Sequence, residues 1–406
     1  MGPPHFNMKL DKDNPEAGIK EIMKKLRPDL DPNELELVEF NEGISNKLVG
    51  CRKAGTPRKD IILFRLYGNK TELFIDRKRE LETFKILHSR GYGAPVYATF
   101  DNGISYGFIE GEVLDTVTIA DDHISTLIAK HMAELHAIPP KGTGKPTSSL
   151  FKTILSSWTW FLLIFLIKPR IKDVRVECLS KAKLLEEAAR LQGVLEKHDC
   201  PVVFCHNDML CKNIVFNKEE DKVYTIDYEY ANFNPLAHDI GNHFCEYAGA
   251  HSFDDDDGED DGDGDNGDGG DDGDGDGDVD SIMMMVMMMM MMIGMQLNLG
   301  DKTIGVEEVD YSLYPKKDHQ LKWLRTYLTR SAELKGESNP KITDKEVGKL
   351  YVQANQFALA AHFFWGIWAL LQAHFSEIDF DFLGYGIIRF NEYFKRKDEF
   401  LALGAN

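Results

Sequence analysis

The sequence predicts an α+β protein of two lobes, with a small β-rich lobe over residues 1–112 and a larger, mainly helical lobe over residues 113–406. Segments rich in Val, Ile, Leu and aromatic residues follow one another between residues 35 and 109, as strands do. Helical spacing of apolar residues dominates from residue 122 onward. With 406 residues, 43% of them hydrophobic, the chain can fill two lobes and is not a wholly disordered protein.

The first lobe is expected to combine strands with two helices. Residues 17–26 have helical spacing, and residues 79–89 are amphipathic, with Leu81, Phe84 and Leu87 on one face. The turn-forming run at 101–103 indicates a hairpin. The expected strands cover residues 35–40, 47–51, 61–67, 96–100 and 105–109.

The second lobe is expected to be built from helices around a polar cluster. Two short apolar strands, 201–205 and 223–226, each lead into polar residues between positions 206 and 246. A cleft between two lobes is a usual place for a ligand, so this cluster is the expected site. The expected helices cover residues 122–137, 178–198, 317–335, 343–374 and 380–396.

The strongly acidic net charge comes from one short segment. The formal charge is −20, and residues 254–280 hold 16 Asp and Glu without any Lys or Arg, which leaves −4 for the rest of the chain. No basic stripe dominates, so nucleic acid is not an expected partner.

The cysteines and the start of the chain favour a cytoplasmic protein. The six cysteines are thinly spread and form no C-x-x-C pair, which indicates reduced thiols rather than disulfides or zinc. No apolar stretch typical of a secretory signal follows Met1. The apolar run at 161–167 is shorter than the roughly 20 residues that span a bilayer, so no stable membrane insertion is expected.

Residues 250–308 are expected to form a low-complexity, disordered insertion within the second lobe. Residues 254–280 are almost wholly Asp and Gly, and residues 283–292 are Met except for Val286. Asp272, Asp274, Asp276 and Gly277 match half of a calcium-binding EF-hand loop, but Met283 stands where that loop needs Glu. A GAT repeat encodes Asp and, read one base later, ATG encodes Met. We therefore favour an expanded repeat or a translated intron, and whether this segment and the 161–167 run belong to the mature protein stays open.

The segment H-N-D-M-L-C-K-N, residues 206–213, carries the strongest chemical signal. Phosphotransferases use such an Asp to orient the attacking hydroxyl and accept its proton, and such an Asn to hold Mg²⁺. Asp208 is therefore the candidate catalytic base, and Asn213 is a candidate metal ligand. Asp227 follows a second strand, where kinases place a Mg²⁺-binding Asp. The alternative, that Asp208 and Asp227 only cap turns, does not account for the whole ordered set.

These motifs resemble the choline/ethanolamine kinase family, and most closely its ethanolamine kinase branch. H-N-D-M-L-C-K-N is similar to the H-N-D-L-L-C-K-N of that branch, and Met209 is the one change. The resemblance covers residues about 17–140 and 200–396, apart from the insertion, and residues 141–180 depart from it. The other matching segments are residues 43–51, 65–73, 226–231, 239–244 and 355–372.

The resemblance implies a protein-kinase-like fold that binds ATP and Mg²⁺ between its lobes. Arg65 stands where protein kinases have their strand lysine, so it is expected to contact the nucleotide phosphates and to pair with Glu80. Arg keeps its charge and offers a planar fork of donors for this task, although a plain surface ion pair is the alternative. The other expected nucleotide-binding residues are Ser45, Asn46 and Lys47 in the phosphate loop and Glu110 in the hinge at 108–111.

The resemblance also implies a site for an ammonium group beside the hydroxyl that is phosphorylated. Glu246 matches the carboxylate that binds the ammonium group in this family. Trp365 and Trp368 share a helix face, and aromatic faces attract cations by roughly 0.5–2 kcal/mol each. By spacing alone, the core of an aromatic helix is the favoured place for the two tryptophans, and the resemblance reverses this preference. The remaining expected amine-site residues are Tyr230 and Tyr385.

The implied activity is ATP-dependent phosphorylation of ethanolamine to phosphoethanolamine, a step of phosphatidylethanolamine and phospholipid biosynthesis, with Mg²⁺ as the cofactor. The oligomeric state stays open, a homodimer included. Three alternatives remain. They are a choline or dual-specificity kinase, a catalytically impaired kinase-like binding protein, and an antibiotic phosphotransferase, which would not be expected to carry W-G-I-W at 365–368.

Overall fold

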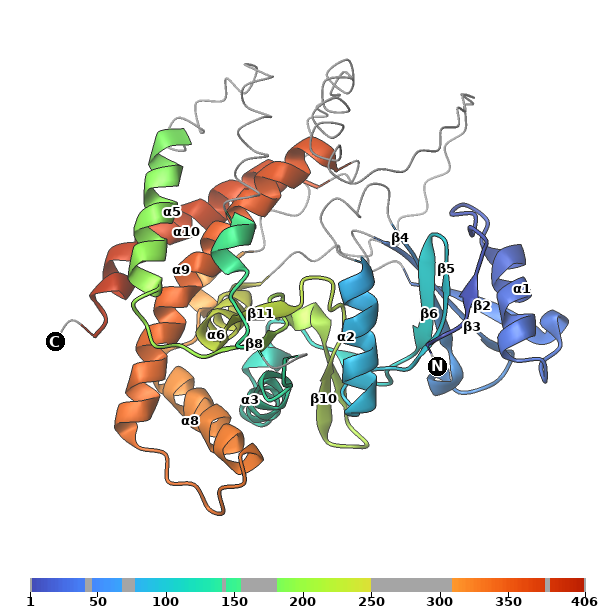
Figure 1. Cartoon of the computed structure of the whole chain (residues 1–406), viewed down its shortest axis with the longest axis horizontal. Helices are drawn as coiled ribbons and strands as arrows, with labels where there is room; N and C mark the ends of the chain where they lie inside the picture. Colours follow the sequence, from blue (N-terminus) through green and yellow to red (C-terminus); the bar gives the residue numbers. More distant parts are fainter. Residues whose placement is uncertain are drawn as a thin grey trace.

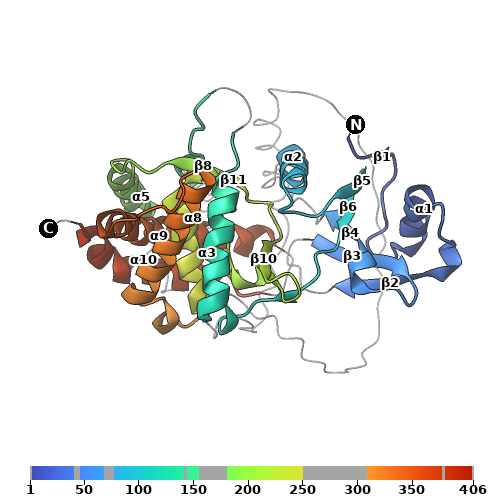
Figure 2. The same cartoon turned by 90° about the horizontal axis from the view of Figure 1, so that it is seen from below.

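In the computed structural model, a β-sheet lobe and a mainly helical lobe lie side by side (Figure 1). The structure describes residues 2–40, 46–67, 77–140, 144–154, 181–249, 309–376 and 380–404. Helix α2 lies between the sheet and the helical lobe in both views (Figures 1 and 2). The predicted order, a small β-rich lobe followed by a larger helical one, is confirmed.

The first lobe is built on one six-stranded sheet of order β1-β5-β6-β4-β3-β2. Helix α1 (Glu16–Leu26) packs Ile19, Ile22 and Met23 onto one face of the sheet. The predicted helix at 79–89 is α2 (Arg77–Ser89), and Phe84 on it lies 5.1 Å from Tyr106 of the sheet, ring centre to ring centre. The strands are β1 (His5–Phe6), β2 (Leu35–Phe40), β3 (Asn46–Lys53), β4 (Ile62–Tyr67), β5 (Val96–Phe100) and β6 (Gly103–Gly107).

One strand of this sheet starts earlier than the sequence predicts. Phe100 pairs directly with Gly103, so the hairpin loop has only two residues and β6 ends at Gly107 rather than at 109. Gly103 fits this position because a Cβ there would lie 2.2 Å from the backbone oxygen of Arg65. The shift leaves residues 108–111 outside the sheet, as the connection toward the second lobe.

The second lobe packs its helices around α9 (Asp344–Phe375). This helix is buried along most of its length because it is apolar on nearly every face, and it contacts α6 and α10 most extensively. Helices α3 and α8 pack together beside it. The other helices are α3 (Asp122–His136), α5 (Lys181–Leu195), α6 (Leu236–Cys245), α8 (Lys317–Leu334) and α10 (Phe382–Ala402).

Two small sheets carry the polar cluster of the second lobe. Strand β7 (Glu112–Val113) comes directly from the first lobe and pairs with β9 (Ile214–Asn217), which pairs with β10 (Lys222–Thr225). Strand β8 (Val202–Cys205) pairs with β11 (Asn232–Pro235). Strands β1, β7 and β11 were not predicted from the sequence. Strands β1 and β7 have only two residues each, too few for a repeating pattern to show, and β11 has the sequence N-F-N-P, which contains no run of apolar residues.

The residues that flank the predicted insertion lie next to each other. The amide of Asp310 donates a hydrogen bond of 2.8 Å to the carbonyl oxygen of Ala248. The predicted insertion at 250–308 and the apolar run at 161–167 lie outside the described residues, as does the start of the helix predicted at 178. Within the described part of the chain, no helix is both long and apolar enough to cross a membrane.

Candidate active site

The segment between β8 and β9 brings the candidate base and one candidate metal ligand together. Asn213 Nδ2 donates a hydrogen bond of 3.0 Å to Asp208 Oδ2 and another of 3.0 Å to the Asp208 carbonyl oxygen. Both side chains are largely buried. Because the amide nitrogen of Asn213 is used in this way, its oxygen is left as the ligand atom for a cation.

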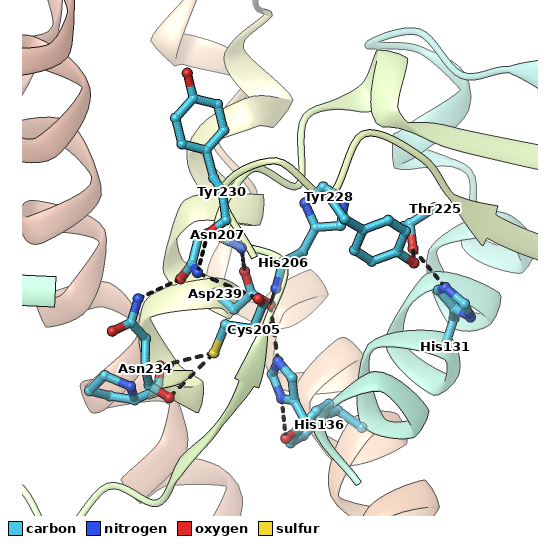
Figure 3. A network of polar contacts seen from close by, with 12 residues as sticks. His131, His136, Cys205, His206, Asn207, Thr225, Tyr228, Tyr230, Asn234 and Asp239 are labelled. Atoms are coloured by element: carbon cyan, nitrogen blue, oxygen red, sulfur yellow. Dashed lines mark hydrogen bonds and ion pairs between the residues drawn. The ribbon is translucent and has the colours of Figure 1, made fainter. Parts of the chain in front are cut away.

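Asp239 of α6 anchors this segment from below (Figure 3). Its carboxylate accepts hydrogen bonds from the amides of His206, at 2.8 Å, and Asn207, at 2.7 Å. His136 contacts the same carboxylate at 3.1 Å, and its other ring nitrogen contacts Tyr327 at 2.7 Å. Burial opposes the charge, but the bonds from His136 and His206 hold the pKa of Asp239 below its ordinary value. The anchor therefore stays ionised at neutral pH and fixes the loop that carries Asp208.

This anchor also contains a group of potential metal ligands, His136, Cys205 and Asp239, within 4.8 Å of one another. Each already has a protein partner, since Cys205 Sγ lies 3.3 Å from the carbonyl oxygen of Asn234. We interpret the group as structural. The sequence predicted no role for Asp239 as an anchor, because its partners are 32, 33 and 103 residues away.

Asp227 is held beside the Asp208 loop in an unusual backbone conformation. Its φ is +55°, in the left-handed region that Asp and Asn tolerate better than most residues. Just before it, the carbonyl oxygen of Ile226 lies 2.8 Å from His206 Nε2, and the Ile226 amide donates to the Asn213 carbonyl at 2.9 Å. The two loops are thus tied together, and His206 acts as a structural link between them.

Arg65 connects the two lobes at this point. It forms an ion pair with Glu80 of α2, so the pairing predicted from the sequence is confirmed. Its Nη1 also donates a hydrogen bond of 3.0 Å to Asp227 Oδ1. Arg77 holds Glu80 from the other side at 3.0 Å. The structure therefore adds a contact that the sequence did not predict, between the arginine expected at the phosphates and a candidate metal ligand.

The structure gives fewer side-chain contacts for the other predicted nucleotide-binding residues, Ser45, Asn46, Lys47 and Glu110. Ser45 and the side chain of Asn46 lie outside the described residues. Lys47 is near Glu39, with 3.5 Å between Nζ and Oε1. The carbonyl oxygen of Glu110 accepts a hydrogen bond of 3.2 Å from Asn217, which places Glu110 at the junction of the lobes.

The four predicted aromatic residues form one cluster near the Asp208 loop. Trp365 packs edge-on against Tyr230 and Trp368, with ring centres 5.4 Å apart in both pairs, and Tyr385 belongs to the same cluster. Trp365 Nε1 donates to Asn242 at 2.8 Å, and Trp368 Nε1 donates to the Tyr230 hydroxyl at 3.0 Å. Each indole is therefore fixed by a hydrogen bond as well as by packing.

A cavity adjoins this cluster. It has a volume of about 160 Å³ and lies between β11, α9 and residues 149–154, with Tyr230 and Trp368 in its wall. The ring of Tyr230 points away from the anchor around Asp239 (Figure 3).

Glu246 follows α6 and lies close to both Asp208 and the aromatic cluster. Its Oε1 accepts a hydrogen bond of 3.1 Å from Arg389 of α10, and both residues are only 2% exposed. Burial raises the pKa of the Glu246 carboxyl, and the guanidinium of Arg389 opposes that rise. The sequence predicted Glu246 but not Arg389, although an Arg among apolar residues in G-I-I-R-F is a signal for a buried charge.

Several carboxylates converge on Asp208. Burial raises the pKa of Asp208 well above its ordinary value, and the negative charges of Glu246, Asp227 and Glu229 raise it further. Glu229 is 6% exposed and was not predicted as a site residue. An aspartate with a raised pKa is a better proton acceptor, and the surrounding negative charge favours a cation in this cleft.

Comparison with known proteins decides the family. The model of one family, described as choline/ethanolamine kinase, matches residues 37–257 and 288–394. The chain belongs to the choline/ethanolamine kinase family. The matched ranges exclude residues 258–287, which lie inside the predicted insertion. As a member of this kinase family, the chain is an ATP-dependent phosphotransferase, as the sequence predicted.

The chain resembles named members of this family over most of its length. It is 48% identical over 409 residues to a probable ethanolamine kinase of Nematostella vectensis, with 99% of both chains covered. It is 40% identical over 389 residues to human ethanolamine kinase 1, and the aligned region covers 95% of this chain and 73% of the human protein.

Solved structures of an ethanolamine kinase, a choline kinase and an aminoglycoside phosphotransferase share the fold. A Plasmodium vivax ethanolamine kinase has a TM-score of 0.69 at 23% identity, with 97% of this chain and 93% of that chain covered. A choline kinase of Cryptosporidium parvum has a TM-score of 0.70 at 23% identity, with 96% and 97% covered. An aminoglycoside phosphotransferase has a TM-score of 0.51 at 13% identity, with 95% of this chain and 99% of that chain covered. The predicted protein-kinase-like fold is confirmed.

Proposed function

We propose that this chain is an ethanolamine kinase, which transfers the γ-phosphoryl group of ATP to the hydroxyl of ethanolamine and forms phosphoethanolamine. The observation that carries the proposal is the position of Asp208, which is bonded to Asn213 and lies among Asp227, Glu246 and the aromatic cluster. Relatives with 33–48% identity over nearly the whole of this chain are named ethanolamine kinases. The product would enter phosphatidylethanolamine synthesis.

Asp208 is the proposed catalytic base. Its carboxylate would orient the hydroxyl of ethanolamine toward the γ-phosphorus and accept the hydroxyl proton as the new P–O bond forms and the bond to ADP breaks. Asn213 holds this carboxylate, and Asp239 holds the backbone of the two residues before Asp208. Phosphoryl transfer requires little covalent chemistry from the protein, so positioning and charge neutralisation carry the rate.

Asn213 and Asp227 are the proposed ligands of a divalent metal ion, which we propose to be Mg²⁺. The donors fit this ion, because an amide oxygen and a carboxylate are the hard oxygen ligands that Mg²⁺ takes together with phosphate oxygens. The side chain of Asp227 is 38% exposed, so it is accessible from the cleft. When bound, the ion would neutralise charge on the transferred phosphoryl group.

The nucleotide would lie between the lobes. We propose that Arg65, held by Glu80, contacts the phosphates, that Ser45, Asn46 and Lys47 cover them, and that Glu110 lies beside the adenine. Arg65 already reaches Asp227 of the other lobe, which supports a position at the metal and phosphate site.

The ammonium group of ethanolamine would lie against Glu246 and the aromatic residues Tyr230, Trp365, Trp368 and Tyr385. Aromatic faces and a carboxylate together recognise small organic cations. Choline is a second candidate acceptor for the same reason, since an aromatic cage also suits a quaternary ammonium group. We also propose a cytoplasmic protein, which the five unpaired cysteines of the described residues support. A homodimer remains open.

The test is ATP consumption by the purified full-length chain with Mg²⁺, with ethanolamine and choline offered separately. Turnover with ethanolamine and a much higher kcat/KM than with choline is the expected result. Preference for choline would make the chain a choline kinase. No turnover with either, from a folded protein that still binds ATP, would favour a kinase-like binding protein.

A further inference from the structure

The one hydrogen-bond partner of the Glu246 side chain in the described part of the chain is another buried charge, Arg389. Nη1 of Arg389 donates to Oε1 of Glu246, and no hydrogen bond to Oε2 is formed by the described residues. The same guanidinium lies 5.7 Å from the ring centre of Tyr385, one turn earlier on α10. Arg389 therefore contacts two residues of the proposed amine site at once.

Arg389 differs from the structural arginines of this lobe. Arg330 bonds both Glu134 and Glu333, and Arg396 bonds both Glu392 and Glu399. Arg389, in contrast, has Glu246 as its single carboxylate partner among the described residues, and its Nε and Nη2 are buried without a hydrogen bond there. An arginine buried with so few bonds is costly to keep for stability alone, so a role through Glu246 is favoured.

We propose that Arg389 is a positioning residue of the amine site, which orients the Glu246 carboxylate in the free enzyme through its bond to Oε1 and leaves Oε2 for the substrate ammonium. This inference rests on the proposed function, because it assigns Glu246 to the amine.

The electrostatic argument concerns the free enzyme. Burial raises the pKa of Glu246, and Arg389 is the group that opposes the rise. Without Arg389, the pKa of Glu246 would rise further, so more of the free enzyme would carry a protonated Glu246, and ammonium binding would first have to expel that proton. Affinity for the amine would then increase with pH, as Glu246 lost its proton.

The other titratable groups around Glu246 do not produce the same pH dependence. Burial raises the pKa values of the Cys and Tyr neighbours and lowers that of His362 well below its ordinary value, so these groups stay neutral. Asp208 is the remaining neighbouring acid, and it is common to all variants below. The neighbours are Asp208 and Cys211 of the catalytic segment, Cys245 of α6, Tyr311 after the insertion, His362 of α9, and Tyr385 of α10.

The experiment compares steady-state kinetics of wild type, Arg389→Met and Arg389→Lys with ethanolamine, at pH values from about 6 to about 8.5. The methionine variant is expected to raise KM for ethanolamine roughly tenfold at pH 7, since each unit of pKa change costs tenfold in ionised Glu246. This KM should fall as pH rises, while wild-type KM stays nearly constant. The lysine variant, which keeps the charge, should restore most of the affinity. KM for ATP should not change.

Two further variants separate positioning from stability. Arg396→Met, two turns nearer the end of α10 and paired with Glu392, should leave the KM for ethanolamine unchanged at every pH. In a Glu246→Gln background, Arg389→Met should change KM less than about twofold, because the group that it acts through is already gone. Melting temperatures show whether each variant is folded, and Arg389→Lys carries the test if Arg389→Met is not.

Several outcomes would overturn the inference. If wild type phosphorylates ethanolamine and Arg389→Met keeps its KM at all pH values, Arg389 is only a structural residue. A lower KM in Arg389→Met would mean that Arg389 competes with the amine instead of preparing its site. A wild type that turns over neither ethanolamine nor choline would overturn the proposed function, and this inference with it.

Discussion

The residues around Asp208 act on it in different ways. Asn213 holds its carboxylate, and Asp239 holds its backbone through the two residues before it. Glu246 and Asp227 surround it with negative charge. A side chain placed in this way can accept a proton only from a group that enters the cleft, which restricts the reaction to a bound acceptor.

Replacement of Asp208 by Asn tests the role of the base. The two side chains have nearly the same shape, so the fold should persist, but the amide cannot accept the hydroxyl proton. A fall in kcat of roughly 100- to 10,000-fold is expected, with small changes in both KM values. The measurement is ATP turnover at saturating ethanolamine.

The matched control is Asp199→Asn, since Asp199 has a fully exposed side chain at the end of the segment before β8. It should have wild-type activity. An Asp208→Asn enzyme with more than a tenth of wild-type kcat would remove Asp208 from the role of base.

At the scale of elements, α9 joins the core to the site. The sequence T-D-K-E at 343–346 predicts its start, and Thr343 and Glu346 form a capping box there. Phe357 and Phe363 face the core, whereas Trp365 and Trp368 lie in the aromatic cluster. The packing of the two tryptophans agrees with the core interpretation, and their role in amine binding stays a prediction.

The region around the insertion is a second element whose structure permits a prediction. Because the Asp310 amide reaches the Ala248 carbonyl, residues 249 and 309 are close enough to be joined directly or by a short linker. Each doubling of loop length costs about 0.6 kcal/mol, so removal of residues 250–308 should stabilise the protein by roughly 2 kcal/mol. Ethanolamine turnover should be retained.

The measurement is a pair of denaturation curves and activity assays for the full-length chain and the shortened chain. A second shortened chain, with a few Gly and Ser residues between 249 and 309, controls for strain at the junction. If both shortened chains fold but lose turnover, residues 250–308 take part in the function, and the interpretation as a repeat or intron is wrong.

For the whole molecule, one contact between the lobes lies at the proposed metal and phosphate site. Arg65 of the first lobe bonds Asp227 of the second, and β7 carries the chain across to pair with β9. A ligand held by residues of both lobes should therefore stabilise the molecule as a unit. The side chain of Arg65 would therefore both bind the nucleotide and hold the two lobes together.

Asp227→Asn tests this link. Mg²⁺·ATP at about 100 times its Kd should stabilise the wild type by about 2.7 kcal/mol and raise its melting temperature. The variant should lose most of the increment that Mg²⁺ adds to ATP alone, because a carboxylate ligand is gone. Asp221→Asn, in the exposed turn between β9 and β10, should respond as wild type does. An undiminished Mg²⁺ response in Asp227→Asn would exclude it as a metal ligand.

The sequence by itself determined the elements and the order of the reactive residues. Periodicity predicted the main helices and most strands within a few residues, because the spacing of apolar side chains is a local property of the chain. The motif at 206–213 likewise predicted that Asp208 and Asn213 lie at one site, since these residues are only five apart, and the structure joins them by a hydrogen bond. Resemblance to the family supplied the candidate amine-site residues, which spacing alone left open.

Only the tertiary structure decided which distant side chains support that site. Asp239 anchors residues about 30 positions earlier, Arg65 reaches Asp227 across 162 residues, and Arg389 reaches Glu246 across 143. No local pattern encodes such pairs, because they depend on how helices and strands pack. The burial that makes these charges influential arises in the same way, since a side chain becomes buried only when other elements cover it.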